Sequence, residues 1–178
     1  MKWKILNSEN VLENEFFKIT SERCQKTDGS VVESYYRIER PEVVMIIPIT
    51  KDQEVVLIEQ YRQPVRSTDI ELPAGYLDTG ESLEQAADRE LLEETGYKAP
   101  KLEKLQDVFS SAGLMSNSIH FFIAKDAEKI AEPQPEPNEE IIVRPTPIKE
   151  AFNLLEQSKI KDMASVLGMH LLKKHLNL

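Results

Sequence analysis

The sequence has 178 residues, of which 40% are hydrophobic and 30% charged, as in a single globular domain rather than a disordered chain. Thirty-one acidic and twenty-two basic residues give a formal net charge of −9, which excludes a generally basic surface for nucleic acid or anionic membranes. The longest apolar run, residues 43–49, contains Pro48 and is far too short to span a bilayer.

The only cysteine is Cys24, so an intramolecular disulfide and a cysteine-based zinc site are excluded. The first residues contain no apolar segment of the signal-peptide kind. These two features predict a cytoplasmic protein. Because the chain has neither internal repeats nor a linker, we expect one domain over residues 1–178, with an N-terminal strand region at about 1–40 and a core at about 41–178.

Strands are predicted for most of the first seventy-five residues, because the apolar segments there are short and rich in β-branched and aromatic residues. The predicted strands are residues 15–25, 31–40, 42–50, 54–62 and 69–75. Asp28-Gly29 joins the first two as a hairpin turn. The third is apolar almost throughout, which is typical of a strand covered on both faces.

A helix is predicted for residues 83–95. Ser82 and Gln85 have the spacing of a capping box, and Gly96 is a typical helix stop. Strands follow at 102–110 and 118–125, then an extended proline-rich loop at 132–137, a strand at 139–147, and helices at 148–157 and 161–176. The predicted class is α+β, with a largely antiparallel sheet.

The charge is concentrated in residues 75–97, which we call the acidic segment. It contains seven acidic residues and one base, Arg89, so it carries −6 of the total −9. Glu90, Glu93 and Glu94 lie on one face of the predicted helix, where they repel one another unless a cation lies between them. Clustered carboxylates suit Mg²⁺, but a solvated acidic helix is the commoner outcome of such a run.

The spacing of the acidic segment resembles the signature of the Nudix hydrolases. The matching residues are Gly75, Glu81, Arg89-Glu90-Leu91, Glu93-Glu94 and Gly96-Tyr97, with Tyr97 in place of the more usual aliphatic residue. Gln60-Tyr61-Arg62 and the segment 71–75 are similar to the branch that hydrolyses ADP-ribose and nucleoside diphosphate sugars. The resemblance implies a Nudix-like α/β/α sandwich with a mixed sheet, N-terminal antiparallel strands and a C-terminal helix.

Carried over position by position, the resemblance implies that Glu90, Glu94 and the backbone carbonyl of Ala74 bind metal, with Glu93 joining them when substrate binds. It further implies two or more Mg²⁺ ions, or Mn²⁺. Arg89 is expected to hold a glutamate of the segment in place, although an ordinary i,i+4 pair with Glu93 is the plainer reading. Arg62, Glu71 and Gly75 are expected to contact the substrate, since the planar fork of Arg62 suits phosphate oxygens.

The expected reaction is attack of water on the diphosphate of an ADP-ribose or GDP-mannose type compound, which yields a nucleoside monophosphate and a sugar phosphate. The resemblance places the general base on a late loop, where Glu140 is the first candidate and Glu139 the second. Asn117 stands where relatives have an acid and cannot act as a base, so the range of nucleotide sugars stays open.

Three alternatives remain: a pyrophosphatase for free nucleotides or dinucleoside polyphosphates, a non-catalytic ADP-ribose sensor, and a structural interaction protein in which the glutamate spacing is coincidence. The first is disfavoured by residues 60–62 and 71–75, and the second by the intact acidic segment. The resemblance also implies a homodimer, in which the N-terminal strands help to form the partner's binding site. No nucleic-acid or membrane partner is expected.

Overall fold

The computed structural model describes residues 1–178, which form two compact units. The first unit consists of Met1–Glu42 and Val108–Ser118, and the second of Val43–Asp107 and Ile119–Leu178. The predicted single domain includes both units and stays a prediction.

The first unit is built on a three-stranded antiparallel sheet in the order β1-β2-β3. Strands β2 (Lys18–Gln25) and β3 (Val31–Glu39) confirm the predicted hairpin. Strand β1 (Lys4–Glu13) was not predicted separately, because its residues do not alternate between polar and apolar. Residues 108–118 join the unit through backbone hydrogen bonds between Ile38 and Leu114 (2.8 Å) and between Ser116 and Ile38 (3.1 Å).

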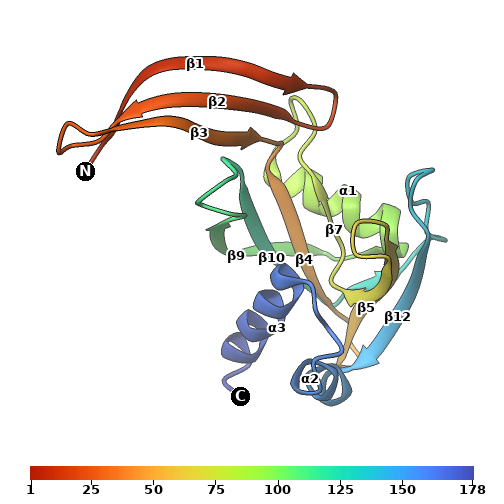
Figure 1. Ribbon diagram of the computed structural model, residues 1–178. Helices are drawn as coiled ribbons and strands as arrows, with labels where there is room; N and C mark the ends of the chain where they lie inside the picture. The colour runs from red at the N-terminus through yellow and green to blue at the C-terminus, as the bar shows by residue number, and fades with distance from the viewer. The chain divides into compact units, whose positions relative to one another are not determined.

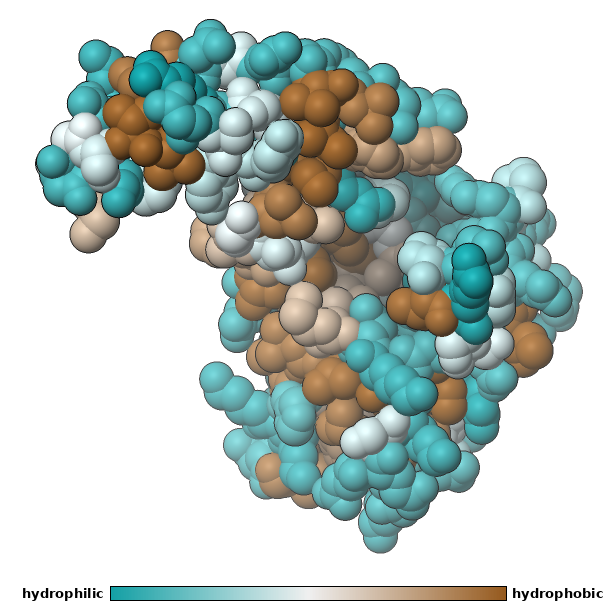
Figure 2. Space-filling model, in the orientation of Figure 1, coloured by the Kyte–Doolittle hydropathy of each residue, from teal (hydrophilic) through white to brown (hydrophobic).

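All ten residues of β1 are exposed, and large apolar side chains remain uncovered on this sheet. Figure 2 shows hydrophobic residues gathered in patches over the N-terminal strands. The exposed large hydrophobic residues of the sheet and its turns are Trp3, Ile5, Leu6, Val11, Leu12, Phe16, Val31, Tyr35 and Tyr36.

The second unit contains a seven-stranded mixed sheet with the central order β12-β5-β4-β10-β9. These strands are β12 (Ile141–Pro147), β5 (Glu54–Arg62), β4 (Val43–Ile49), β10 (Ser118–Lys125) and β9 (Lys101–Phe109). Strands β4 and β10 are parallel, whereas β5 pairs antiparallel with β4 and with β12. A separate two-stranded sheet, β8 (Tyr97–Lys98) with β11 (Glu128–Lys129), was not predicted because each strand has only two residues.

The predicted strand at 69–75 is two short strands in the structure. Strand β6 (Ser67–Glu71) pairs with β5, and β7 (Ala74–Tyr76) pairs with β4. The chain changes neighbours at Leu72 and Pro73, and proline cannot donate to a strand ladder. The carbonyl of Pro73 instead accepts from the Ile46 N–H at 2.9 Å.

Helices cover both faces of the seven-stranded sheet, as the second unit in Figure 1 shows. On one face, helix α1 (Leu83–Thr95) buries Ala86, Ala87 and Leu91 in a core with strand residues such as Val44 and Phe122. Helix α3 (Met163–His175) lies against the other face, where Gly168 approaches Phe121, and packs beside α2 (Ile148–Glu156). None of the three helices combines the length and apolar character needed to cross a membrane.

Candidate active site

Helix α1 positions the carboxylates of the acidic segment, and its ends form as the sequence predicts. The hydroxyl of Ser82 accepts from the Gln85 N–H at 3.2 Å, and the Gln85 side chain accepts from the Ser82 N–H at 2.8 Å. Gly96 ends the helix in the left-handed region, with φ of 74°. The last turn contains no basic residue, so its glutamates lie at the negative end of the helix dipole.

The three glutamates of this turn differ in exposure. Glu94 is 1% exposed, the Glu90 side chain 13%, and the Glu93 side chain 42%. Burial raises the pKa of Glu94 well above its usual range, and the charges of Glu139 and Glu90 raise it further. Burial likewise raises the pKa of Glu90 to about 7, although neighbouring Arg89 opposes the rise. Both inner carboxyls therefore have a strong tendency to hold protons when no other cation is bound.

Strand β7 lies directly against these carboxyls. The Ala74 N–H donates to Glu94 Oε2 at 2.9 Å. A Cβ atom on Gly75 would lie 2.1 Å from the carboxylate carbon of Glu90, so a larger residue would displace that carboxylate from its place against β7. The structure thus gives Gly75 a steric reason to be glycine, besides its predicted contact with substrate.

Arg89 is the cation at the centre of the acidic segment. Its guanidinium donates to Glu81 through two nitrogens (both 3.1 Å), to Glu90 (2.7 Å), to Glu93 (3.1 Å) and to the Tyr76 carbonyl (2.9 Å). The i,i+4 pair with Glu93 is therefore only one of several bonds. With these bonds Arg89 is placed to hold the Glu90 and Glu93 side chains in position.

Arg62 and Glu71 form a bidentate ion pair at one edge of the same site. Arg62 Nε donates to both Glu71 oxygens (3.0 and 3.2 Å), and Nη2 donates to Oε2 at 2.6 Å. The Glu71 side chain is only 6% exposed, whereas that of Arg62 is 41% exposed. Nη1 is not part of the pair and can donate to a phosphate. Glu71 is therefore better placed to orient Arg62 than to contact the substrate itself.

Burial and charge distinguish the two candidate bases. Strand β12 begins at Ile141, opposite Gln60, and Glu139 and Glu140 lie in the loop directly before it. Glu139 is half-buried, and its charge acts on Glu90, Glu94 and Arg62. Glu140 is exposed, as is nearby Ile142, whose exposed fraction is 61%. The structure thus brings Glu139 to the carboxylate cluster and leaves Glu140 at the surface.

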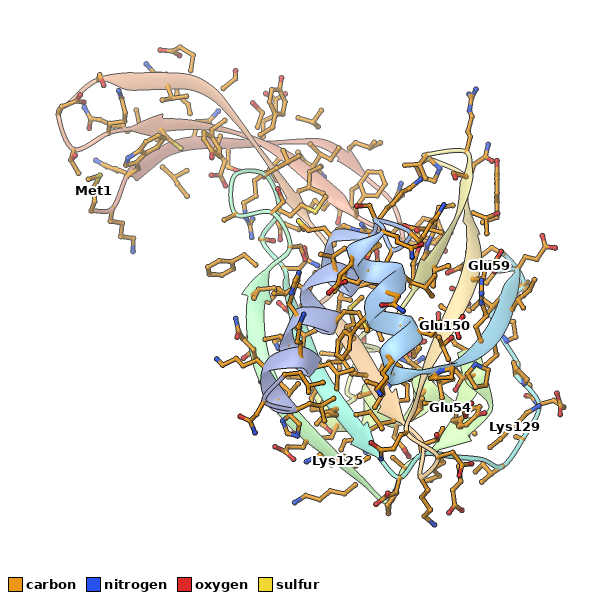
Figure 3. All side chains as sticks on the ribbon, turned by 90° about the horizontal axis from the view of Figure 1, so that it is seen from below. Met1, Glu54, Glu59, Lys125, Lys129 and Glu150 are labelled. Carbon is orange, nitrogen blue, oxygen red and sulfur yellow. The ribbon has the colours of Figure 1, made fainter.

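Arg144 Nη1 donates to Glu59 Oε2 at 2.9 Å and ties β12 to β5 (Figure 3, where Glu59 is labelled). Because this ion pair spans the two strands, it helps to hold β12, which begins two residues after Glu139, beside β5.

The proline-rich loop that precedes Glu139 is fastened to the end of α1, which the sequence analysis did not foresee. The N–H groups of Ile130 and Ala131 donate to the Gly96 carbonyl (2.9 and 3.1 Å), and that of Gln134 donates to the Glu93 carbonyl at 2.7 Å. A Cβ atom on Gly96 would lie 2.1 Å from the Ala131 carbonyl oxygen. Gly96 thus allows the loop to approach the helix. The only sign of this contact in the sequence is the glycine itself.

The donor set fits a hard divalent cation. Glu90 and Glu94 offer carboxylate oxygens beside the Ala74 backbone, and oxygen ligands are those that Mg²⁺ prefers. No three His, Cys, Asp or Glu side chains converge closely enough to hold a metal by themselves. Mg²⁺ is usually coordinated by one or two protein carboxylates together with waters and substrate phosphates, so two carboxylates are a suitable protein contribution.

Two other polar residues have structural partners. Asn117 is 3% exposed and donates to the Pro41 carbonyl at 3.0 Å, which agrees with the expectation that it is not a base. His120 pairs with Asp107 at 2.7 Å.

Comparison with known proteins identifies the family. Residues 39–166 match the model of the NUDIX domain. The chain is 30% identical over 137 residues to an ADP-ribose pyrophosphatase of Bacillus subtilis (strain 168), covering 76% of this chain and 74% of that protein. It is 34% identical over 190 residues to a GDP-mannose pyrophosphatase of Cronobacter sakazakii, covering 100% and 94%.

A solved structure described as an ADP compounds hydrolase superposes with a TM-score of 0.88 at 28% identity, covering 99% of this chain and 95% of the other. The predicted α+β class with its mixed sheet is thereby confirmed. With its acidic segment folded as a capped helix whose carboxylates meet the β7 backbone, this chain belongs to the Nudix hydrolase family.

Proposed function

We propose that this enzyme hydrolyses the diphosphate linkage of nucleoside diphosphate sugars of the ADP-ribose or GDP-mannose type, releasing a nucleoside monophosphate and a sugar phosphate. The observation that carries the proposal is the pair of buried carboxyls, Glu90 and Glu94, held against Ala74 and Gly75. The names of the relatives, ADP-ribose pyrophosphatase and GDP-mannose pyrophosphatase, support the substrate class.

Glu90, Glu94 and the Ala74 carbonyl would hold two or more Mg²⁺ ions, or Mn²⁺, together with the substrate. When bound, these cations neutralise the negative charge of the diphosphate and acidify water. Glu93 is the most exposed of the three glutamates and is bound to Arg89, so it is the ligand free to join when substrate arrives. Arg89 would keep Glu90 and Glu93 oriented.

Arg62 would bind the diphosphate through Nη1 while Glu71 holds the other side of the guanidinium. Glu139 is the base that the geometry favours, because it is half-buried and its charge acts on Glu90, Glu94 and Arg62, and Glu140 becomes the second candidate. In this scheme a Glu139 carboxylate oxygen takes the proton of the attacking water.

A homodimer is part of the proposal. Exposed apolar residues on β1–β3 support it, because monomeric proteins seldom leave large apolar patches in water. The N-terminal strands would then help to form the partner's binding site. A cytoplasmic location remains a prediction that rests on the single free cysteine, Cys24.

A substrate panel tests the proposal. ADP-ribose, GDP-mannose, UDP-glucose, a dinucleoside polyphosphate and a nucleoside triphosphate are each incubated with Mg²⁺, Mn²⁺ or EDTA, and the products are identified by phosphorus NMR. We expect hydrolysis of at least one nucleotide sugar, only with metal, to the two monophosphates. Glu90→Gln should be inactive, and Glu84→Gln, on the exposed side of α1, should retain activity. Hydrolysis of triphosphates alone would contradict the sugar assignment.

A further inference from the structure

Leu72, Pro73 and Ala74 connect β6 to β7 and are held from three directions. The Leu72 N–H donates to Ser165 Oγ at 3.0 Å, the Pro73 carbonyl accepts from Ile46, and the Ala74 N–H donates to Glu94 at 2.9 Å. Because proline has no N–H, both donors of this segment are bonded to side chains. One side chain belongs to α3 and the other to α1, on opposite faces of the sheet.

Ser165 lies in the first turn of α3 and is completely buried. Its own N–H donates to the capping residue Asp162 at 2.7 Å, while its side chain turns to the sheet and bonds Leu72, 93 residues earlier in the chain. A buried backbone N–H without a partner is strongly unfavourable, and Ser165 is what satisfies this one.

Gly168 completes the contact of α3 with the segment. It lies one turn after Ser165, on the same face of the helix. A Cβ atom there would be 2.5 Å from Leu72 Cδ1 and 3.3 Å from Phe121 Cε1. The absence of a side chain at Gly168 therefore allows α3 to come close enough for the Ser165 bond to form.

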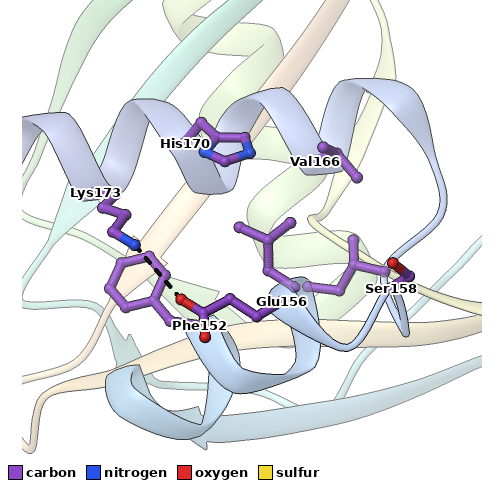
Figure 4. Close-up of a pocket in the computed structure, with 8 residues that line it drawn as sticks. Phe152, Glu156, Ser158, Val166, His170 and Lys173 are labelled. Carbon is purple, nitrogen blue, oxygen red and sulfur yellow. Dashed lines mark ion pairs between the residues drawn. The ribbon is translucent and has the colours of Figure 1, made fainter.

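A different face of α3 has other neighbours. Val166, His170 and Lys173 line a cavity of about 230 Å³ between α2 and α3, where Lys173 pairs with Glu156 at 3.6 Å (Figure 4). Val166 is adjacent to Ser165 in the chain but faces this cavity, so it offers a matched control.

We propose that Ser165 is a positioning residue for the metal site: its bond to Leu72 fixes the backbone segment in which the Ala74 N–H bonds Glu94 and from which the Ala74 carbonyl would reach the metal. The inference rests on the proposed function, in which that carbonyl is a metal ligand. Hydrogen bonds behind metal ligands orient them, and their loss usually weakens metal binding by about 10- to 100-fold.

The test compares the wild type with Ser165→Ala, Ser165→Cys, Ser165→Thr and Val166→Ala. Mn²⁺ affinity is measured without substrate by electron paramagnetic resonance of the free ion, and hydrogen exchange is measured at the Leu72 amide. Ser165→Ala should raise the Mn²⁺ dissociation constant about tenfold or more and speed exchange at Leu72. Ser165→Thr, which keeps the hydroxyl, should restore both, and Val166→Ala should change neither even where it lowers stability.

Ser165→Cys keeps the size of the side chain and replaces the hydroxyl by a weak acceptor, so it takes the place of Ser165→Ala should that variant not fold. Excess Mg²⁺ should restore the turnover of the weakened variant. Wild-type Mn²⁺ affinity in both the Ala and Cys variants would overturn the positioning role alone. A wild type that binds no Mn²⁺, even with a nucleotide sugar present, would overturn the proposed function, and the positioning role with it.

Discussion

Glu90, Glu93 and Glu94 carry equal formal charges but lie in different surroundings. Glu94 is buried and bonded to Ala74, Glu90 is nearly buried and bonded to Arg89, and Glu93 is partly exposed. Taking carboxylates out of water disfavours their charged form, so in the metal-free protein bound protons reduce the negative charge that a metal ion would otherwise neutralise. The buried carboxylates are therefore suited to binding cations, and they lower the stability of the metal-free fold.

Glu90→Gln should change how the stability of the metal-free protein depends on pH. The Glu90 pKa rises from an ordinary 4.5 to about 7 in the folded state, so the folded protein holds a proton that the unfolded chain has lost in this range. The free energy of unfolding should therefore fall as the pH rises from about 4.5 to 7, by up to roughly 3 kcal/mol from this group. The variant should show a shallower fall, because Glu94 still acts in the same direction.

Urea unfolding in EDTA at pH 5, 6, 7 and 8 measures this dependence for both proteins. Adding Mg²⁺ at pH 8 should stabilise the wild type more than the variant, since metal binds the deprotonated carboxylate. Parallel pH curves for wild type and variant would show that Glu90 is not protonated in the fold.

At the scale of elements, the loop that leads into β12 determines which glutamate reaches the site. The pairing of β12 with β5 begins at Ile141, and of the two residues before it Glu139 is half-buried whereas Glu140 is exposed. The turn before the strand keeps Glu139 near the loop, since its carboxylate accepts from the Glu136 N–H at 3.1 Å.

Glu139→Gln and Glu140→Gln make a matched pair of variants at neighbouring residues that differ in burial. Glu139→Gln should lower kcat by two or more decades, in the range typical of a lost general base, with little change in KM or in melting temperature. Glu140→Gln should retain nearly normal turnover, because its side chain is at the surface. Steady-state kinetics at saturating Mg²⁺ measures both.

The reverse pattern would assign the base to Glu140, the first candidate by sequence. Normal turnover in both variants would move the role to a carboxylate of the acidic segment.

At the scale of the whole molecule, the first unit exposes more apolar surface than its three strands can cover. Ile5 is 57% exposed and Val11 is 54% exposed, both on β1. A sheet with an uncovered face and an open edge strand is suited to packing against another chain. The proposed homodimer would bury such residues.

Ile5→Glu combined with Val11→Glu should convert the proposed dimer into a monomer, because the interface would have to bury two unpaired charges. The fold itself should persist, since both side chains are already exposed. Sedimentation velocity measures the change, with Leu178→Glu as control at a terminal residue that is 69% exposed. A monomeric wild type, or a double variant that remains dimeric, would contradict the prediction.

Local interactions explain why so much of the molecule could be predicted. Helix α1 begins and ends where predicted, because its capping box and its terminal glycine act on neighbouring backbone groups. Strands β4 and β5 follow from continuous runs of apolar and β-branched residues. The spacing of the acidic segment alone also identified the family that the comparisons confirm.

Only the tertiary structure decided how residues from distant segments share the site. The three glutamates differ in burial, the loop before β12 brings Glu139 rather than Glu140 near them, and Glu71 on β6 holds Arg62 on β5. The bond from Leu72 to Ser165 joins residues 93 positions apart, which no local pattern reveals. Local chemistry determines where an element starts and stops, whereas desolvation and strand register depend on neighbours that are assembled only when the chain folds.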